Sequence, residues 1–494
     1  MESVSKLRYD PLMSNTISTL PSGLLSKHLH STFMELLRFS SFILVTSIEA
    51  FFILKKRKPI FHVFFLICFI LFFIVKHFLS KASSVYLVDF SCLRPPSFCR
   101  VPFSSFLENA SMLECFDVES ISFMAKVLSS SGLSEETYLP PALHYIPPKP
   151  HVEEAIKEVH MVLFPILEDL LSKTRLLPHD IDILIVNCSG FCPSPSLSSI
   201  IINKYSMRSD IKSYTLSGMG CSASTIAVDM ALSLLKIHKN SCAVVLSTEI
   251  LSTGWYPGNE MPKLLLNCMF RMGSAAILLS NKSEAKKCSK YKLYRTLRTQ
   301  TASDDKAYFS AVREEDSKGN LGFTLNKGVQ QAVGEVLRSN VTFLGSSILP
   351  FKEKFRVFVS ILRKIFIDKS RHETYVPSFK TVIQHFCLPT AGKATIREIA
   401  KGLKLEDKDI EPALMTLERF GNQSSSALWY ELALLEAKDR VKKGDMVWLL
   451  GLGSGLKCSS VVLECIRPIV GESKRGPWAD YLCRYPIVTV DQGL

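Results

Sequence analysis

From residue 85 onward, compact apolar runs alternate with longer amphipathic stretches. The short runs predict strands buried on both faces, and apolar positions spaced three or four residues apart predict helices. The predicted strands are residues 181–186, 211–216, 243–247, 275–280, 446–451 and 459–464. The predicted helices are residues 152–173, 225–238, 395–403, 412–417 and 423–437. This alternation indicates an α/β fold in which helices cover both faces of the sheet.

The N-terminal part differs because its apolar residues form unbroken stretches rather than a periodic pattern. Residues 60–75 are almost wholly apolar, and together with residues 76–79 they are long enough to span a bilayer. Residues 36–54 form a weaker candidate span, since Arg38 and Glu49 interrupt it. The segment therefore predicts one or two N-terminal membrane helices.

A basic cluster at residues 55–58 lies between the two candidate spans. A helical hairpin would return both flanks to one side of the membrane. The positive-inside rule, in contrast, would place the basic loop in the cytosol and the large domain in the lumen. Taken alone, these residues leave both orientations open.

The same patterns divide the chain into consecutive parts. These are a polar, serine-rich and disordered N-terminus (1–32), the membrane segment (33–80), a first globular half (85–349), a basic aromatic connection (350–371), a second half (372–470) and a tail (471–494). The polar start lacks the apolar content that folding requires.

Composition and charge narrow the classes of partner. The 494-residue chain is 47% hydrophobic and carries a net charge of +13, from 59 basic and 46 acidic residues. Such an excess suits an anionic membrane surface or a polyanionic ligand, and coenzyme A with its phosphates qualifies. The chain shows no arginine-rich arm, zinc-finger spacing or basic-aromatic alternation, so nucleic acid is not a predicted partner. Its 14 scattered cysteines do not form a convincing metal site.

The most informative candidate for chemistry is Cys221, in the sequence LSGMGCSAS. It lies where a predicted strand gives way to a predicted helix, so the positive end of the helix dipole would favour its thiolate. Gly218 and Gly220 leave room for a substrate, and backbone N–H groups there are placed to face a developing oxyanion. The alternative is a buried structural cysteine beside a tight turn.

Several long segments carry a family resemblance. They are YLVDFSCLRPPSFCRVPFSSF from Tyr86, SEETYLPPA from Ser134, DIDILIVNCSGFCPSPSLSSIIINKY from Asp180, SGMGCSAS from Ser217, NCMFRMGSAAILLSN from Asn267, RFGNQSSSALWYEL from Arg419 and GLGSGLKCSS from Gly451. Over residues 85–470 the chain resembles the plant-type 3-ketoacyl-CoA synthases, the membrane condensing enzymes that elongate very-long-chain fatty acids.

This resemblance implies a thiolase-type fold with αβαβα layers from two related halves, preceded by membrane helices. It also implies a dimer at the endoplasmic reticulum membrane, with the catalytic domain facing the cytosol. The expected substrates are a long-chain acyl-CoA and malonyl-CoA, and no cofactor or metal is expected. Related synthases, in mixed dimers, and other elongase subunits are the expected protein partners.

The resemblance also assigns roles to residues. Cys221 matches the family nucleophile, whose thiolate takes the acyl chain as a thioester. Asn422 matches the family asparagine, which together with a histidine stabilises the enolate formed when malonyl-CoA loses carbon dioxide. The resemblance thus implies that Cys221 and Asn422 share one cavity.

The chain departs from the family at the catalytic histidine. In HFCLPTAGKATI, Pro389 occupies that position, and proline has neither an ionisable group nor an N–H donor. Gln300 and Glu418 stand where many members have further histidines. Only His385 remains of the usual set, either as a structural histidine near the site or as a substitute base.

Two functions therefore stay open at the level of the sequence. The first is an active elongase condensing enzyme with an unusual site, using Cys221, Asn422 and His385. The second is a catalytically impaired member that acts as a partner or regulator of active condensing enzymes. Losing a positioned acid–base group typically costs about 10²- to 10⁴-fold in rate, which makes position 389 decisive.

Overall fold

The computed structural model describes residues 84–326, 328–366 and 375–482, with residues 63–71 and the single residues Ser47, Phe51 and Lys55 of the N-terminal segment. The predicted disordered N-terminus, most of the predicted membrane segment and the end of the predicted tail lie outside these residues. The described residues between Val85 and Val341 and from Ser378 onward form one compact unit. Those of Ser18–Ser84 and Thr342–Pro377 form a second, smaller unit.

The larger unit is built on a nine-stranded sheet with strand order β3-β2-β4-β5-β1-β6-β11-β10-β9. Its strands are β1 (Tyr86–Cys92), β2 (Ile183–Asn187), β3 (Lys212–Leu216), β4 (Cys242–Thr248), β5 (Ser274–Ser280), β6 (Tyr291–Gln300), β9 (His385–Cys387), β10 (Met446–Gly453) and β11 (Lys457–Cys465). A separate hairpin joins β7 (Ala311–Glu315) and β8 (Leu321–Leu325). The predicted α/β class and each predicted strand are confirmed.

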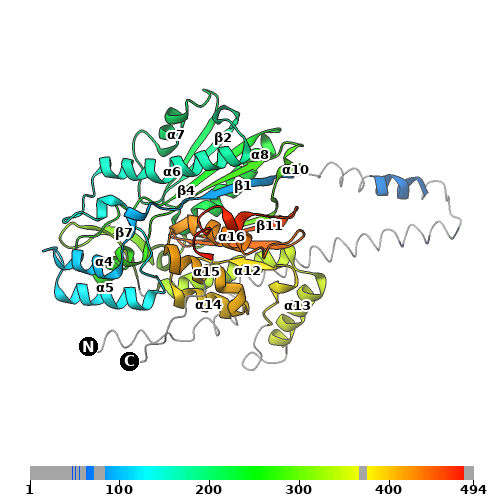
Figure 1. The fold of residues 1–494 in the computed structure, drawn as a ribbon. Coiled ribbons are helices and arrows are strands. Elements are labelled where there is room, and N and C mark those ends of the chain that lie inside the picture. Colours follow the sequence, from blue (N-terminus) through cyan, green and yellow to red (C-terminus); the bar gives the residue numbers. More distant parts are fainter. Residues whose placement is uncertain are drawn as a thin grey trace. The chain divides into compact units, whose positions relative to one another are not determined.

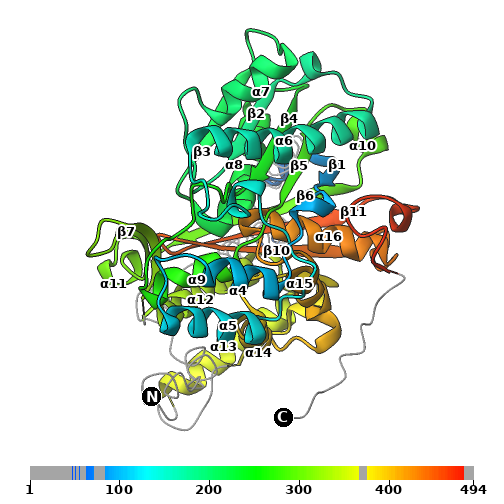
Figure 2. The same ribbon diagram turned by 60° about the vertical axis from the view of Figure 1, so that its left-hand side comes forward.

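Some helices separate and cover the two parts of this sheet, and others pack on those helices or on the β7–β8 hairpin (Figures 1 and 2). They are α4 (Phe103–Ser111), α5 (Val118–Ser131), α6 (Val152–Thr174), α7 (Leu197–Tyr205), α8 (Ala223–Ile237), α9 (Met261–Met269), α10 (Ala285–Cys288), α11 (Asp305–Tyr308), α12 (Val329–Ile348), α14 (Lys393–Leu403), α15 (Asp407–Phe420) and α16 (Ala427–Ala437). Helix α8 packs on β2 and β4 and also on β10 and β11, while α16 packs on β9, β10, β1 and β5. These two helices are therefore the inner layer between the N-terminal and C-terminal strands.

The two halves of the sheet repeat one pattern. In the first half, β2 runs parallel to β4, β4 antiparallel to β5, and β5 antiparallel to β1. In the second half, β9 runs parallel to β10, β10 antiparallel to β11, and β11 antiparallel to β6. In both halves a short 3-10 turn precedes the inner helix: η4 (Gly220–Ser222) before α8 and η6 (Ser424–Ser426) before α16. The repeat places both turns at the junction between the halves, where they contact each other.

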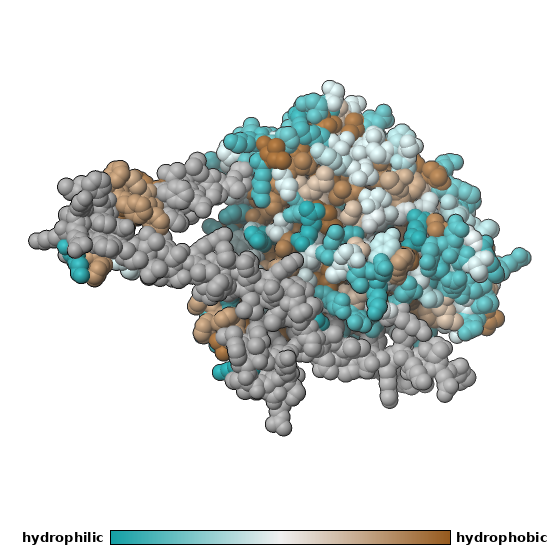
Figure 3. Space-filling model, turned by 180° about the vertical axis from the view of Figure 1, so that it is seen from behind, coloured by the Kyte–Doolittle hydropathy of each residue, from teal (hydrophilic) through white to brown (hydrophobic). Residues whose placement is uncertain are grey.

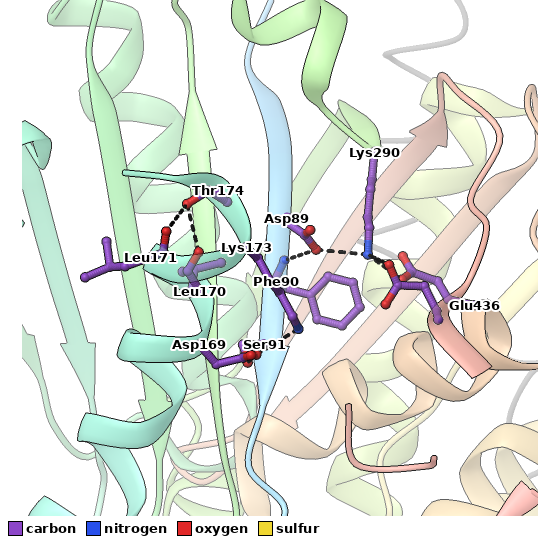
Figure 4. A network of polar contacts seen from close by, with 11 residues as sticks. Asp89, Phe90, Ser91, Asp169, Leu170, Leu171, Lys173, Thr174, Lys290 and Glu436 are labelled. Carbon is purple, nitrogen blue, oxygen red and sulfur yellow. Dashed lines mark hydrogen bonds and ion pairs between the residues drawn. The ribbon is translucent and has the colours of Figure 1, made fainter. Parts of the chain in front are cut away.

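A buried lysine ties the two halves together. Lys290, 4% exposed, lies 2.9 Å from Asp89 on β1, 2.8 Å from Glu436 on α16 and 2.9 Å from Glu472 (Figure 4). Tyr291 donates a second hydrogen bond to Glu436 at 2.8 Å. Because the three carboxylates come from both halves of the chain, this charge cluster holds β1 against the C-terminal helix.

The candidate membrane segment is described only in part. Residues 63–71, inside the predicted span 60–75, are helical, and their exposed apolar side chains are brown in Figure 3. The second predicted span, residues 36–54, lies outside the described residues except for Ser47 and Phe51. Within the described part of the chain, one helical stretch, Gly220–Ile237, has the length and mean hydropathy of a span. This stretch comprises the 3-10 turn Gly220–Ser222 and the core helix α8, and half of its residues are buried.

The smaller unit contains helix α13 (Phe351–Phe366), whose sequence FKEKFRVFVSILRKIF alternates basic and apolar residues. Glu353 is bonded to Arg356 and Tyr375, each at 2.8 Å. Phe351 and Phe355, 67% and 54% exposed, stack on each other at its start. This helix lies within the predicted basic aromatic connection.

Candidate active site

The predicted nucleophile lies in the tight turn η4, directly between β3 and α8. Gly218 and Gly220 have φ of 68° and 58°, in the left-handed region that favours glycine. A Cβ on Gly220 would lie 2.5 Å from the backbone nitrogen of Ser454. The turn therefore requires glycine both for its backbone conformation and for close contact with the C-terminal half.

The contact comes from the glycine-rich loop between β10 and β11. A Cβ on Gly453 would meet the carbonyl oxygen of Met219 and lie 3.1 Å from the backbone nitrogen of Ser222. The sequence GLGSG thus packs backbone against backbone on the nucleophile turn. No helix follows the loop, since β11 begins at Lys457, so it does not have the geometry of a dinucleotide-binding turn.

The second predicted site residue, Asn422, enters from the C-terminal half. Its backbone N–H donates to Met269 at 3.2 Å, and its carbonyl accepts from Arg271 at 2.9 Å. Its side-chain oxygen accepts a hydrogen bond from the backbone N–H of Ser424 at 2.9 Å, which assigns the other amide atom as nitrogen. Among the described residues no group accepts a hydrogen bond from that Asn422 Nδ2, so it is available to a substrate.

Ser424 connects the two predicted residues. Its Oγ lies 3.5 Å from Cys221 Sγ, and its backbone holds the Asn422 side chain. Ser424 has a φ of 55°, a left-handed conformation that is uncommon outside glycine. The structure therefore brings Cys221 and Asn422 together at the meeting of turns η4 and η6.

The electrostatics of Cys221 differ from the sequence-based expectation. Burial raises the pKa of the Cys221 thiol to about 11, and the nearby Glu249 carboxylate adds to this, while the Ser424 hydrogen bond lowers it. The helix dipole favours a thiolate, but desolvation of the charged sulfur outweighs it. A thiol whose pKa is raised in this way requires a proton acceptor to become a nucleophile.

Glu249 is a residue of this site that the sequence analysis did not identify. Its Oε2 lies 3.1 Å from Ser424 Oγ, and its Oε1 accepts backbone N–H bonds from Ser189 at 3.0 Å and Gly190 at 2.5 Å. Burial raises the pKa of this carboxyl. The available signal was its position directly after β4, a strand parallel to its neighbour, because sites collect at the carboxyl ends of such strands.

His385 does not join this cluster. It lies on β9 opposite Val447, and its Nε2 is 2.9 Å from Asp445 Oδ2. Gly451, which contacts Ser222 at the end of the nucleophile turn, is four positions further along β10 than Val447, about 13 Å at roughly 3.3 Å per residue. Burial lowers the pKa of His385. The arrangement favours the structural alternative for His385 over the substitute base.

The other departures from the family pattern are also placed. Extending the parallel β9–β10 register by two residues sets the buried Pro389 level with Gly451, whose Cβ position is 3.1 Å from Ser222. Gln300 is exposed at the end of β6, opposite Lys457. Glu418 lies on α15, where burial raises the pKa of its carboxyl. Pro389 is thus the departure that lies nearest the nucleophile turn.

In the part of the chain that the structure describes, no group of three His, Cys, Asp or Glu side chains is arranged to hold a metal ion. The cluster consists of a thiol, a bridging hydroxyl, a carboxylate and a free amide donor. Such a set suits acyl transfer to a cysteine, with the amide available for a thioester oxygen.

The chain matches two family models and is similar to known plant proteins. Residues 77–366 match the family model "FAE1/Type III polyketide synthase-like protein", and residues 380–465 match "3-Oxoacyl-[acyl-carrier-protein (ACP)] synthase III C terminal". The chain is 50% identical to 3-ketoacyl-CoA synthase 5 of Arabidopsis thaliana, covering 85% of each chain. It is 47% identical to 3-ketoacyl-CoA synthase 6 of the same plant, covering 85% of this chain and 84% of the relative.

Solved structures support the fold. A fungal type III polyketide synthase superposes with a TM-score of 0.61 at 15% identity, covering 77% of this chain and 99% of that one. The synthase PKS-I from the brown alga Ectocarpus siliculosus superposes with a TM-score of 0.61 at 16% identity, covering 78% and 100%. At these identities the likeness concerns the fold alone, and it confirms the predicted thiolase-like architecture.

Proposed function

Because the chain belongs to the 3-ketoacyl-CoA synthase family, we propose that it condenses a long-chain acyl-CoA with malonyl-CoA. The products are a 3-oxoacyl-CoA, carbon dioxide and free coenzyme A, in the elongation of very-long-chain fatty acids. The observation that carries this proposal is the meeting of Cys221 and Asn422 across Ser424.

The residues divide the reaction between them. Cys221 attacks the acyl-CoA thioester and holds the acyl chain as a second thioester. Asn422 Nδ2, which lacks a described acceptor, donates to the thioester oxygen of malonyl-CoA as the enolate charge develops there. An imidazole would normally share this task, and Pro389 supplies none. We therefore expect condensation to be slow relative to family members that keep the histidine.

The test is an elongation assay with the full-length protein in membranes, supplied with malonyl-CoA and a series of long acyl-CoAs. We expect an acyl adduct on Cys221 by peptide mass spectrometry and a slowly formed 3-oxoacyl-CoA. Cys221→Ser should abolish both, while Cys192→Ser, at an exposed cysteine, should change neither. An adduct of equal size in Cys221→Ser would refute the assignment. Acylation without any condensation would instead support the impaired-partner function.

We also place the protein at the endoplasmic reticulum membrane, with its catalytic unit facing the cytosol. The exposed apolar helix at residues 63–71 supports an N-terminal anchor. Helix α13 adds basic side chains and the exposed Phe351–Phe355 pair, a combination typical of helices that lie on anionic lipid. Protease protection of tagged protein in sealed microsomes would test the orientation, because cytosolic facing predicts cleavage of the catalytic unit without detergent.

The family resemblance extends the proposal to assembly, as a homodimer or as a mixed dimer with related synthases and other elongase subunits. Light scattering of the detergent-solubilised protein should give the mass of two copies. Co-purification with a differently tagged active synthase would test the mixed form.

A further inference from the structure

Burial raises the pKa of the Cys221 thiol, and among the described residues no histidine hydrogen-bonds to its Sγ or contributes to its pKa, so another group must activate it. Among the described residues, Glu249 is the charged group that perturbs the Cys221 thiol. The two are bridged by one hydroxyl: Ser424 Oγ is 3.5 Å from Cys221 Sγ and 3.1 Å from Glu249 Oε2. A serine hydroxyl has one proton to donate and lone pairs to accept. It can therefore accept from the thiol while donating to the carboxylate.

We propose that Glu249, acting through Ser424, is the proton acceptor that activates Cys221. This inference rests on the proposed function and concerns its first half-reaction. The thiol proton passes to Ser424 Oγ as the Ser424 proton passes to Glu249 Oε2, leaving a Cys221 thiolate and a neutral Glu249. The thiolate forms a bond to the acyl carbon, the bond from that carbon to the coenzyme A sulfur breaks, and the proton returns along the same path to that sulfur. One acyl-CoA thus yields acyl-Cys221 and free coenzyme A with no net proton change.

The surroundings fix Glu249 for this role. Backbone N–H groups of Ser189 and Gly190 hold Oε1, so Oε2 is left to face Ser424. Burial raises the pKa of Glu249, which makes it a stronger base than an exposed carboxylate. Ser424 is positioned in turn by its backbone bond to Asn422.

Among the residues that the structure describes, Cys188 and Glu158 are ionisable groups that interact with Glu249. Cys188 Sγ lies 3.6 Å from Oε1, and burial raises the pKa of that thiol, so it stays neutral. Burial raises the pKa of Glu158 on α6 to about 7, and the negative charge of Glu249 contributes to this increase. Arg313 on β7 bonds the carbonyl oxygen of Gly190 rather than the carboxylate.

The relay predicts two effects of opposite sign for Glu249→Gln. Acylation of Cys221 by a long acyl-CoA at pH 7 should fall by about 10²-fold, the usual contribution of a positioned base. Alkylation of Cys221 by iodoacetamide at pH 8 should instead rise by about threefold or more, because removing a like charge lowers the thiol pKa. A purely structural role for Glu249 would move both rates in the same direction.

Variants of Ser424 must tolerate the positive φ of this residue. Because its φ is positive, Ser424→Gly removes the hydroxyl without strain, and Ser424→Ala checks that added flexibility is not the cause. Both should slow acylation and also slow alkylation, since the hydrogen bond to Cys221 that lowers the thiol pKa is lost. Ser426→Ala is the matched control, because Ser426 Oγ donates to Gln423 at 2.8 Å within the same turn.

The assays use the full-length protein in detergent, with rates read on the Cys221 peptide and thermal unfolding recorded for every variant. The relay is overturned if Glu249→Gln acylates within threefold of wild type, or if its acylation and alkylation fall together. It is also overturned if Ser426→Ala loses as much acylation as Ser424→Gly. Failure of the proposed function would look different: wild-type protein would form acyl-Cys221 but no 3-oxoacyl-CoA.

Discussion

Replacing Pro389 by histidine should raise condensation while leaving acylation of Cys221 nearly unchanged. Pro389 is buried, and extending the β9–β10 register sets it level with Gly451, whose Cβ position is 3.1 Å from Ser222 at the end of the nucleophile turn. We expect an imidazole introduced there to stabilise the enolate charge. Two buried oxygen atoms beside it have no described hydrogen-bond partner, Glu431 Oε1 and Thr390 Oγ1. Either would orient an introduced imidazole.

The expected gain in condensation rate can be compared with the expected loss of folding stability in Pro389→His. A positioned acid–base group contributes about 10²-fold at the low end, equivalent to about 2.7 kcal/mol of the activation barrier. Losing the proline restores freedom to the unfolded chain and costs about 0.4–1 kcal/mol of stability. Folding is thus only slightly affected while the rate increase is large enough to measure.

The assay compares wild type, Pro389→His and Pro389→Gln in the same membranes, measuring acyl-Cys221 formation and 3-oxoacyl-CoA release separately. Pro389→Gln removes the proline without adding an imidazole, so it should stay near wild type. Pro389→His should condense about 10²-fold faster and acylate within about threefold of wild type. A wild type that condenses quickly and is slowed by the histidine would refute the reasoning and point to another base.

Three further predictions test the fold and the membrane surface. Lys290→Met should lower the free energy of unfolding, measured in urea, by about 3–5 kcal/mol, because three carboxylates would lose their buried cation. Lys292→Met is the control. A decrease below about 1 kcal/mol in Lys290→Met would contradict the prediction. Burial lowers the pKa of folded His385, so the unfolded chain binds that proton first as the pH falls. Stability should therefore decline below about pH 6.5, and an equally steep decline in His385→Gln would exclude His385 as the cause. Deleting residues 1–80 should release the protein from anionic vesicles only partly at low salt. Adding Lys352→Glu and Lys354→Glu to the truncated protein should complete the release. A truncated protein that is fully soluble at low salt would show that α13 does not bind lipid.

The helices and strands with strong apolar patterns were predictable, and those that depend on neighbours were not. Strands β2, β4 and β5 are fully buried and read as unbroken apolar runs. Strand β6 has the sequence YKLYRTLRTQ, and its many polar side chains are not typical of a central strand. It is central because it pairs with β11 along its length and with β1 over two residues. Strand β9 is only three residues long. Neither has a local signal strong enough to identify it.

The sequence also identified part of the site. Cys221 and Asn422 were predicted to share a cavity, because their motifs match those of a family. Glu249 and Ser424 were missed, since nothing in STEI or NQSSS marks either as a partner of a cysteine 28 or 203 positions away. His385 was a candidate because of its residue type, and its distance from Cys221 became visible only with the β9–β10 register.

The sequence by itself determined the α/β class, the strand–cysteine–helix turn and the apolar N-terminal segment. Each of these depends on residue type or on local periodicity. Only the tertiary structure decided which groups surround the thiol, because turns η4 and η6 meet through the packing of α8 and α16 between the two half-sheets. It also decided the direction in which the Cys221 pKa is shifted, since desolvation and the charge of Glu249 depend on burial and distance, and these outweigh the helix dipole that the local sequence suggested.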